Sequence, residues 1–211
     1  TVEFWLNKQS FDDSKESPRQ VVCDVWNSSS WDNGDYGRFR VELSGAATTL
    51  GTNFNVELLS GTAGISLSGA HSPNASIGMS ASAIAGADWN HFALSFVNSG
   101  SQMTGRLYRN GNLEYTITTG SSIGLITGSM FGQIGSLVTS VSGNISEQGS
   151  GLLSASLDEF RFWKIKRTSE QVGRYWFCQV NGGTNTDYAK DYGAATKYSY
   201  SNPVDLGIYY K

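Results

Sequence analysis

The sequence predicts an all-β fold, a jelly-roll sandwich of two antiparallel sheets with one short helix near the C-terminal third. Short runs rich in β-branched and aromatic residues recur, separated by Gly, Ser, Asn and Asp. The 211 residues include 25 Gly but only 3 Pro, and 16% are charged. This composition favours many short strands joined by tight turns. Finally, Leu157–Trp163 predicts a long, late strand closing the sandwich, and a helix start follows at Thr168.

Eleven runs carry the strand pattern, and turn residues separate them at the spacing typical of a sandwich. They are Val2–Leu6, Gln20–Trp26, Gly37–Leu43, Phe54–Leu59, Gly64–Leu67, Ser76–Ser80, His91–Val97, Thr104–Arg109, Leu113–Thr118, Gly132–Ser136 and Leu152–Trp163. A further strand is expected at the C-terminal Leu206–Lys211.

The clearest hairpin is centred on Asn110-Gly111. Both residues tolerate the positive φ that a type I′ turn demands. Because side chains alternate along a strand, Leu107 and Arg109 are expected on one side of the sheet and Tyr108 on the other.

The helix is expected from about Ser169 to Phe177. Thr168 can cap its N-terminus, with Gln171 reaching back as a capping box. Val172, Tyr175 and Trp176 fall on one helical face, which indicates core packing.

Charge and hydropathy exclude two classes of partner. The formal net charge is −3, no run of Lys and Arg is present, and no apolar stretch has the length of a membrane span. We therefore expect neither nucleic-acid binding nor membrane insertion. The chain begins directly in a strand, so residues 1–211 are expected to form a single domain within a longer multidomain chain.

The two cysteines, Cys23 and Cys178, each lie in an apolar segment. They are either buried free thiols that act as small hydrophobic side chains or one disulfide, which would imply an oxidising compartment. Two cysteines alone do not decide between these alternatives.

Three segments carry distinctive strand patterns. The opening strand Val2–Leu6 shows a hydrophobic-Glu-aromatic-Trp pattern, Trp89–Phe96 shows Trp-x-His-hydrophobic-Ala, and Leu157–Trp163 shows Asp-Glu-hydrophobic-Arg-hydrophobic-Trp. In these three patterns the chain resembles the laminin-G-like, concanavalin A-like lectin/glucanase superfamily. The resemblance spans nearly the whole chain in order. It implies a jelly-roll sandwich whose usual role is glycan binding, protein binding or architectural spacing.

Catalytic chemistry is not expected. Hydrolases of that superfamily carry carboxylates two residues apart on one strand, whereas Asp158 and Glu159 are adjacent and should point to opposite faces. Glu159 and Arg161 should share a face, where they can pair across neighbouring strands. The only histidines are His71, expected in an exposed loop, and His91, expected to be a hydrogen-bonded structural residue.

The segment Asp24–Tyr36 is the best candidate for a ligand-binding rim. Sugar rings stack on aromatic planes while their hydroxyl groups bond to carboxylates and amides. The candidate ligand-binding residues are Trp31, Tyr36, Asp32, Asn33 and Asp35. Trp26 is an alternative member of this rim or a residue of the sandwich core.

Asp32 and Asp35 are also candidate metal ligands, because calcium prefers closely spaced oxygen atoms. The alternative is an ordinary turn, which Asp, Asn and Gly favour without a metal. No cofactor other than this calcium ion is expected.

Together these observations predict a non-catalytic, lectin-like recognition or adhesion module of a larger surface or virion protein. Its expected partners are a glycan or a surface protein, reached through loops at one end, and its expected location is extracellular, on a cell or a virion. The alternative is a structural or assembly domain of a virion, fibre or extracellular sheath, packed against neighbouring domains or copies of itself. An exposed aromatic loop favours recognition, whereas apolar patches and strand-mediated contacts favour assembly.

Overall fold

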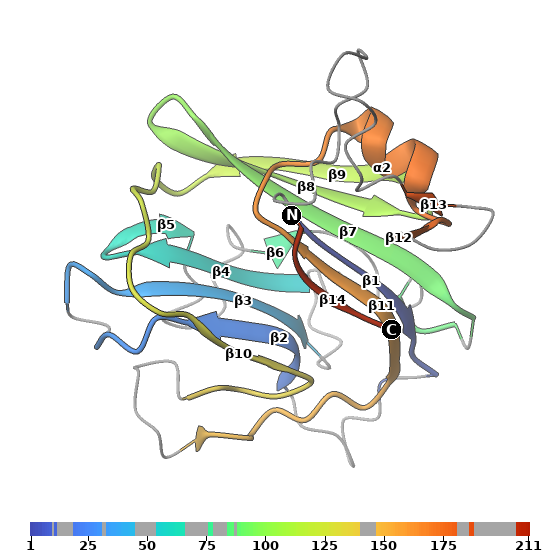
Figure 1. The fold of residues 1–211 in the computed structure, drawn as a ribbon, viewed down its shortest axis with the longest axis horizontal. Coiled ribbons are helices and arrows are strands. Elements are labelled where there is room, and N and C mark those ends of the chain that lie inside the picture. The colour runs from blue at the N-terminus through green and yellow to red at the C-terminus, as the bar shows by residue number, and fades with distance from the viewer. Residues whose placement is uncertain are drawn as a thin grey trace.

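The computed structural model describes residues 1–9, 11, 19–30, 33–44, 54–65, 76–77, 84–86, 88–139, 147–180, 186–187 and 206–211. Within these residues the chain forms a sandwich of two antiparallel sheets with a short helix, α2 (Figure 1). The predicted all-β sandwich is thereby confirmed.

The first sheet has the strand order β14-β11-β1-β7-β8-β9. Its strands are β1 (Val2–Asn7), β7 (Asn90–Ser99), β8 (Gln102–Arg109), β9 (Asn112–Thr119), β11 (Ser156–Trp163) and β14 (Leu206–Tyr210). The predicted late strand β11 thus lies inside this sheet, between β1 and β14.

The second sheet has the order β10-β2-β3-β4-β5, and β6 also pairs with β4. Its strands are β2 (Arg19–Trp26), β3 (Gly37–Ser44), β4 (Phe54–Ser60), β5 (Ala63–Ile65), β6 (Ser76–Ile77) and β10 (Phe131–Ile134). A separate parallel pair is formed by β12 (Gln179–Val180) and β13 (Thr186–Asp187).

Each predicted run contains a strand, although several strands are shorter than predicted. The run Leu152–Trp163 becomes strand only from Ser156, and Leu152 is exposed. The run Gly132–Ser136 leaves the strand at Ile134, and the next residue, Gly135, has a positive φ of 82°. The predicted residues 66–67 and 78–80 lie outside the described part of the chain.

The core lies between the facing sheets. Phe4 of β1, Phe92 of β7 and Phe54 of β4 are fully buried there, with ring centroids 5.2–6.3 Å apart. Burying each such side chain contributes about 1.5–3 kcal/mol. The residues between these core positions point away from the core and form the outer face of each sheet.

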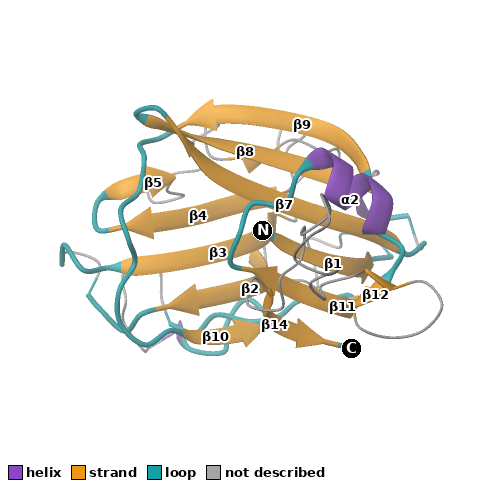
Figure 2. Ribbon diagram, turned by 45° about the horizontal axis from the view of Figure 1, so that its top comes forward, coloured by secondary structure: helices purple, strands orange, loops and turns teal. Residues whose placement is uncertain are grey.

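Helix α2 (Ser169–Tyr175) covers part of the outer face of the first sheet (Figures 1 and 2). Val172 of α2 packs against Ala93 of β7 and Tyr108 of β8. The predicted capping box is confirmed: Gln171 N–H donates to Thr168 Oγ1 at 3.2 Å, and Thr168 N–H donates to Gln171 Oε1 at 2.7 Å. The helix ends two residues before the predicted Phe177.

The predicted Asn110-Gly111 hairpin joins β8 to β9, with φ values of 47° and 80°. Leu107 lies in the core between the sheets, whereas Tyr108 packs under α2 on the outer face. The expected alternation of these two residues is therefore confirmed.

Candidate functional site

The sequence-predicted ligand rim lies in the loop between β2 and β3. Trp31 and Asp32 fall outside the described residues. Asn33 and Asp35 form a turn, because Asp35 N–H donates to Asn33 Oδ1 at 3.0 Å and Tyr36 N–H donates to the Asn33 carbonyl at 3.0 Å. Both side chains are exposed. A calcium site that uses Asp32 and Asp35 stays a prediction.

Tyr36 does not line an exposed rim. Its side chain is 1% exposed, and its hydroxyl group donates to Glu57 Oε1 at 3.3 Å. Burial and the neighbouring carboxylate of Glu57 raise the pKa of Tyr36 to about 12. The Tyr36 ring therefore offers no face on which a sugar could stack.

Trp26 is not part of the core between the sheets. It is half-buried on the outer face of the second sheet, paired with Arg38 on β3 and with Phe131 on β10. Its indole N–H donates to the Ser29 carbonyl at 2.8 Å. Trp26 is therefore neither a core residue nor a fully exposed ring on which a sugar could stack.

A row of buried charges crosses the outer face of the second sheet. Arg38 donates to both carboxylate oxygens of Asp24, at 2.8 and 2.6 Å. Arg40 pairs with Glu57 at 2.8 Å and with Glu42 at 2.7 Å. All five residues are at most 4% exposed. The alternation of charged and apolar residues in β3 assigns Arg38, Arg40 and Glu42 to one face, but it does not reveal that the face is covered.

The segment after β10 covers part of this row. The Val138 N–H donates to Asp24 Oδ2 at 2.9 Å, and the Thr139 carbonyl accepts from Arg38 at 2.9 Å. These partners come from more than 100 residues away in sequence. Asp24, although within the predicted rim segment, is therefore committed to a structural ion pair.

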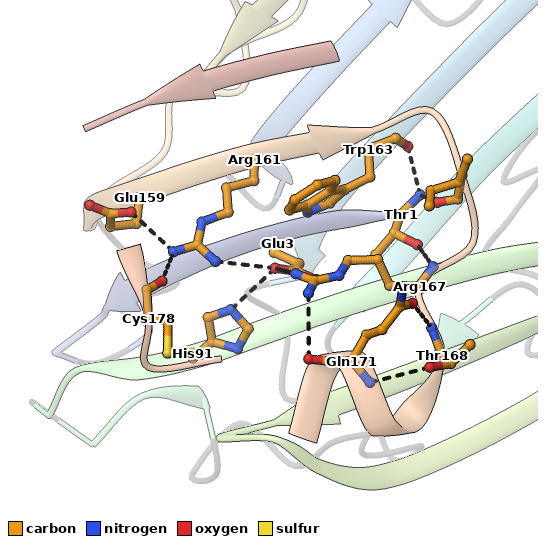
Figure 3. Close-up of polar contacts among 11 residues, drawn as sticks. Thr1, Glu3, His91, Glu159, Arg161, Trp163, Arg167, Thr168, Gln171 and Cys178 are labelled. Atoms are coloured by element: carbon orange, nitrogen blue, oxygen red, sulfur yellow. Dashed lines mark hydrogen bonds and ion pairs between the residues drawn. The ribbon is translucent and has the colours of Figure 1, made fainter. Parts of the chain in front are cut away.

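A second charge network centres on Glu3, on the outer face of the first sheet. Figure 3 shows the side chains of Arg161, Arg167 and His91 directed toward Glu3. Arg167 Nη1 donates to both carboxylate oxygens at 3.0 Å, and Arg161 Nη1 lies 3.5 Å from Oε2. Burial raises the pKa of Glu3, but Arg167, His91 and Arg161 outweigh it, so the net pKa is lowered.

His91 lies beside this network and is 1% exposed. Its Nε2 is 3.9 Å from Glu3 Oε2, and within the described residues neither ring nitrogen has a hydrogen-bond partner. The ring instead packs against Trp5 and Trp176, at centroid distances of 5.7 and 6.2 Å. The predicted structural role of His91 agrees with its burial, and its backbone N–H donates to Asn110 Oδ1 at 2.8 Å, but a side-chain hydrogen bond is absent among the described residues. Burial lowers the pKa of His91 to about 4. The other histidine, His71, lies outside the described residues.

Glu159 and Arg161 share a face as expected, but they pair directly within β11, with Arg161 Nη2 3.1 Å from Glu159 Oε2. Tyr209 of β14 also donates to that oxygen, at 2.5 Å. Glu159 has a φ of 50° and sits at a bulge opposite β1. A bulge inserts an extra residue into one strand, here β11. Asp158 nevertheless lines the cleft described below, whereas Glu159 pairs with Arg161 on the outer face.

An open cleft lies between the edges of the two sheets, with a volume of about 510 Å³. Its apolar floor comes from the inner faces of both sheets: Phe160 and Phe162 on β11, and Cys23 and Val25 on β2. Cys23 is a free thiol. Its pKa is raised, mainly by burial and also by the negative charge of Asp24.

The rim of the cleft is formed by the two edge strands. Tyr210 pairs with Phe160 and Ile208 pairs with Phe162 across β11 and β14. On the opposite side, Ile134 of β10 pairs with Cys23. The polar members of the lining are Gln133, Asp158 and Lys211.

This combination of an apolar floor with a few polar groups is typical of ligand sites, whose volumes are commonly about 300–1,000 Å³. Sequence reasoning missed the cleft because it arises from the positions of β10 and β14 relative to each other. The alternating patterns give the inward residues of each strand, but they do not give the gap between two edges.

Comparison with protein-family models, curated proteins and solved structures gave no match. The resemblance to the laminin-G-like, concanavalin A-like superfamily accordingly stays a prediction. Among the described residues, no helix combines the length and apolar character that crossing a bilayer requires. The same residues contain no group of three or more His, Cys, Asp or Glu side chains placed to hold a metal ion.

Proposed function

We propose that this domain is a non-catalytic recognition module of a larger surface or virion protein, and that it binds a glycan or a protein. The observation that carries the proposal is the cleft between the sheet edges. Its aromatic and aliphatic floor provides apolar contact, while Gln133, Asp158 and Lys211 can orient a ligand at the rim. The resemblance to lectin-like domains supports the same class of function.

The state of the buried carboxylates supports a non-catalytic role. Glu3, Asp24 and Glu57 are each paired with an arginine at 2.6–3.0 Å. A general acid or nucleophile has to reach a substrate, whereas these groups are at most 2% exposed. Their arrangement fits a role in holding strands together.

The experiment is a binding screen against a glycan array and a library of immobilised peptides, run with calcium and with EDTA. Two variants test the cleft: Tyr210→Ala removes an exposed ring from the rim, and Gly132→Val fills space. A Cβ at Gly132 would lie 3.4 Å from Val25 Cγ2, at ordinary van der Waals distance, and the backbone there does not require glycine. Tyr115→Ala, a tyrosine on the opposite edge strand β9, is the matched control.

We expect both cleft variants to lose peptide binding by about tenfold or more, with unchanged melting temperature, and the control to bind like the wild type. Peptide binding that survives Gly132→Val would remove the cleft from the proposal. A blank screen in both conditions would overturn the recognition function itself.

One observation favours the second candidate, an assembly domain. The edge strands β10 and β14 expose Phe131 and Tyr210, which are 55% and 60% accessible. Edge strands with exposed apolar side chains are common sites of strand pairing between chains. Sedimentation velocity over a range of concentrations tests this function, since an assembly domain should self-associate and lose that property with Tyr210→Lys.

A further inference from the structure

A cluster of aromatic rings lies where the segment after α2 meets β1. The ring of Trp176 is 5.5 Å from that of Trp5 and 5.5 Å from that of Phe177. The rings of Trp176 and Phe177 meet at 80° and so form a corner. This cluster lies outside the cleft described above, whose lining contains none of these three residues.

Accessibility increases outward through this cluster. His91 is buried beneath it, Trp5 and Trp176 are half-buried, and Phe177 is 51% exposed. A ring needed only to hold α2 on the sheet would be expected to be covered, as Val172 is. Phe177 instead contacts the ring of Trp176 and leaves about half of its own surface exposed to water.

The β8–β9 turn, which carries Asn110 and Asn112, borders the Trp176 ring of this cluster. A Cβ at Gly111 would overlap Trp176 Cδ1 and lie 2.7 Å from its Nε1, so the indole packs directly on the turn. Asn110 is committed, since its amide donates to Asn90 at 3.0 Å and accepts from His91 N–H at 2.8 Å. Asn112, on the other side of Gly111, is exposed, and its amide lies 3.5 Å from the Asn110 carbonyl.

We propose that this corner is a carbohydrate-binding site that takes a hexopyranose ring of a glycan. The C–H face of the sugar stacks on the ring of Phe177 against the wall formed by Trp176, and the Asn112 amide bonds to a sugar hydroxyl group. The inference rests on the proposed recognition function and gives it a ligand class. It places the sugar on the outer face of the first sheet, away from the cleft.

The test measures binding of soluble oligosaccharides of glucose, galactose, mannose and N-acetylglucosamine by isothermal titration calorimetry and tryptophan fluorescence. The central variant is Phe177→Leu, which keeps an apolar side chain but removes the aromatic plane. Phe177→Tyr keeps the plane. Phe131→Leu is the matched control, because Phe131 has nearly the same exposure, 55%, on the other sheet.

We expect Phe177→Leu to weaken oligosaccharide binding about tenfold, and Phe177→Tyr and Phe131→Leu to change it by less than about twofold. Asn112→Ala should also weaken binding. Because Phe177, Phe131 and Asn112 are all exposed, the four variants should keep the wild-type melting temperature. Lost binding at an unchanged melting temperature would show that the Phe177 ring does more than hold the fold together.

Two results overturn the inference. If an oligosaccharide binds and Phe177→Leu binds it equally well while Gly132→Val does not, the sugar site is the cleft and the recognition function stands. If the wild type binds none of the oligosaccharides, the corner is not a sugar site, and the recognition function then depends on the peptide screen with the cleft variants.

Discussion

The carboxylate of Glu3 accepts hydrogen bonds from one nitrogen of Arg167, at 3.0 Å to each oxygen, across 164 residues of sequence. Glu3 lies in the first strand of the chain, whereas Arg167 follows β11 and lies just before the cap of α2. Arg167 Nη2 also contacts the Gln171 carbonyl of α2 at 3.4 Å. The pair therefore ties the opening strand to the helix and to the turn that precedes it.

Breaking this pair should be strongly destabilising. Glu3→Gln keeps the shape of the side chain but leaves Arg161 and Arg167 without their shared buried carboxylate. Removing one partner of a buried ion pair costs about 3–5 kcal/mol, because the remaining charge stays buried without compensation. Urea unfolding of the wild type and the variant measures the difference.

The control for this substitution is the exposed pair Glu170–Arg174, at 2.9 Å and about half exposed on both sides. Glu170→Gln should cost about 0.5 kcal/mol or less, since water and salt screen an exposed pair. Equal effects of Glu3→Gln and Glu170→Gln would contradict the structural role assigned to Glu3.

The buried His91 should make stability depend on pH. Burial lowers its folded pKa to about 4, whereas an unfolded histidine has a pKa of about 6.5. Between these values the unfolded chain binds a proton that the folded chain does not, so stability falls as the pH falls from 6.5 to 4. The loss due to His91 should be about 3 kcal/mol.

Unfolding of the wild type and of His91→Phe at several pH values measures this contribution. The difference between the two profiles should be concentrated between pH 6.5 and 4. Glu3 acts at lower pH: its pKa is lowered in the folded state, so its contribution is present above the unfolded value of about 4.3 and is lost as the pH falls further. Parallel profiles would show that His91 is not held neutral.

Local patterns predicted most of the elements. The Asn110-Gly111 turn and the Thr168–Gln171 capping box are encoded by residues close in sequence, and both are confirmed. Hydrophobic alternation also placed Leu107 and Tyr108 on the correct faces, because the period of a strand is independent of its partners.

The site depends on relationships that local patterns do not contain. Tyr36 was expected on a rim, but it is buried beside Glu57, which a different strand supplies. His91 was expected to be hydrogen-bonded, but Trp176 from the segment after α2 packs on it. Similarly, the bulge at Glu159 depends on pairing with β1. Each of these features depends on contacts between residues far apart in sequence.

Three glycines separate the effects of backbone conformation and packing. Gly111 has a φ of 80° and packs against Trp176, Gly100 has a φ of 63° with nothing within 4 Å of an added Cβ, and Gly34 has neither restriction. A left-handed conformation costs a non-glycine residue about 1–2 kcal/mol. We expect Gly111→Ala to destabilise most, Gly100→Ala by about 1 kcal/mol, and Gly34→Ala by less than about 0.5 kcal/mol.

Thermal and urea unfolding of the three alanine variants checks this order. Gly111→Ala should also change the tryptophan fluorescence of the folded protein, because an added Cβ displaces the indole of Trp176. If Gly111→Ala and Gly100→Ala are equally destabilised and leave fluorescence unchanged, Trp176 does not pack on the turn.

The two thiols should react slowly in the folded protein. Cys23 and Cys178 are not joined by a disulfide and are 1% and 7% exposed. Burial raises the pKa of Cys23, which removes the reactive thiolate.

With a colorimetric thiol reagent and no reductant, we expect negligible reaction of the native protein and two thiols per chain after unfolding in guanidinium. Fewer than two would mean that a disulfide or another modification has formed. Fast native reaction that disappears in Cys23→Ala would show that solvent reaches the floor of the cleft, and a ligand in the cleft should then slow that reaction.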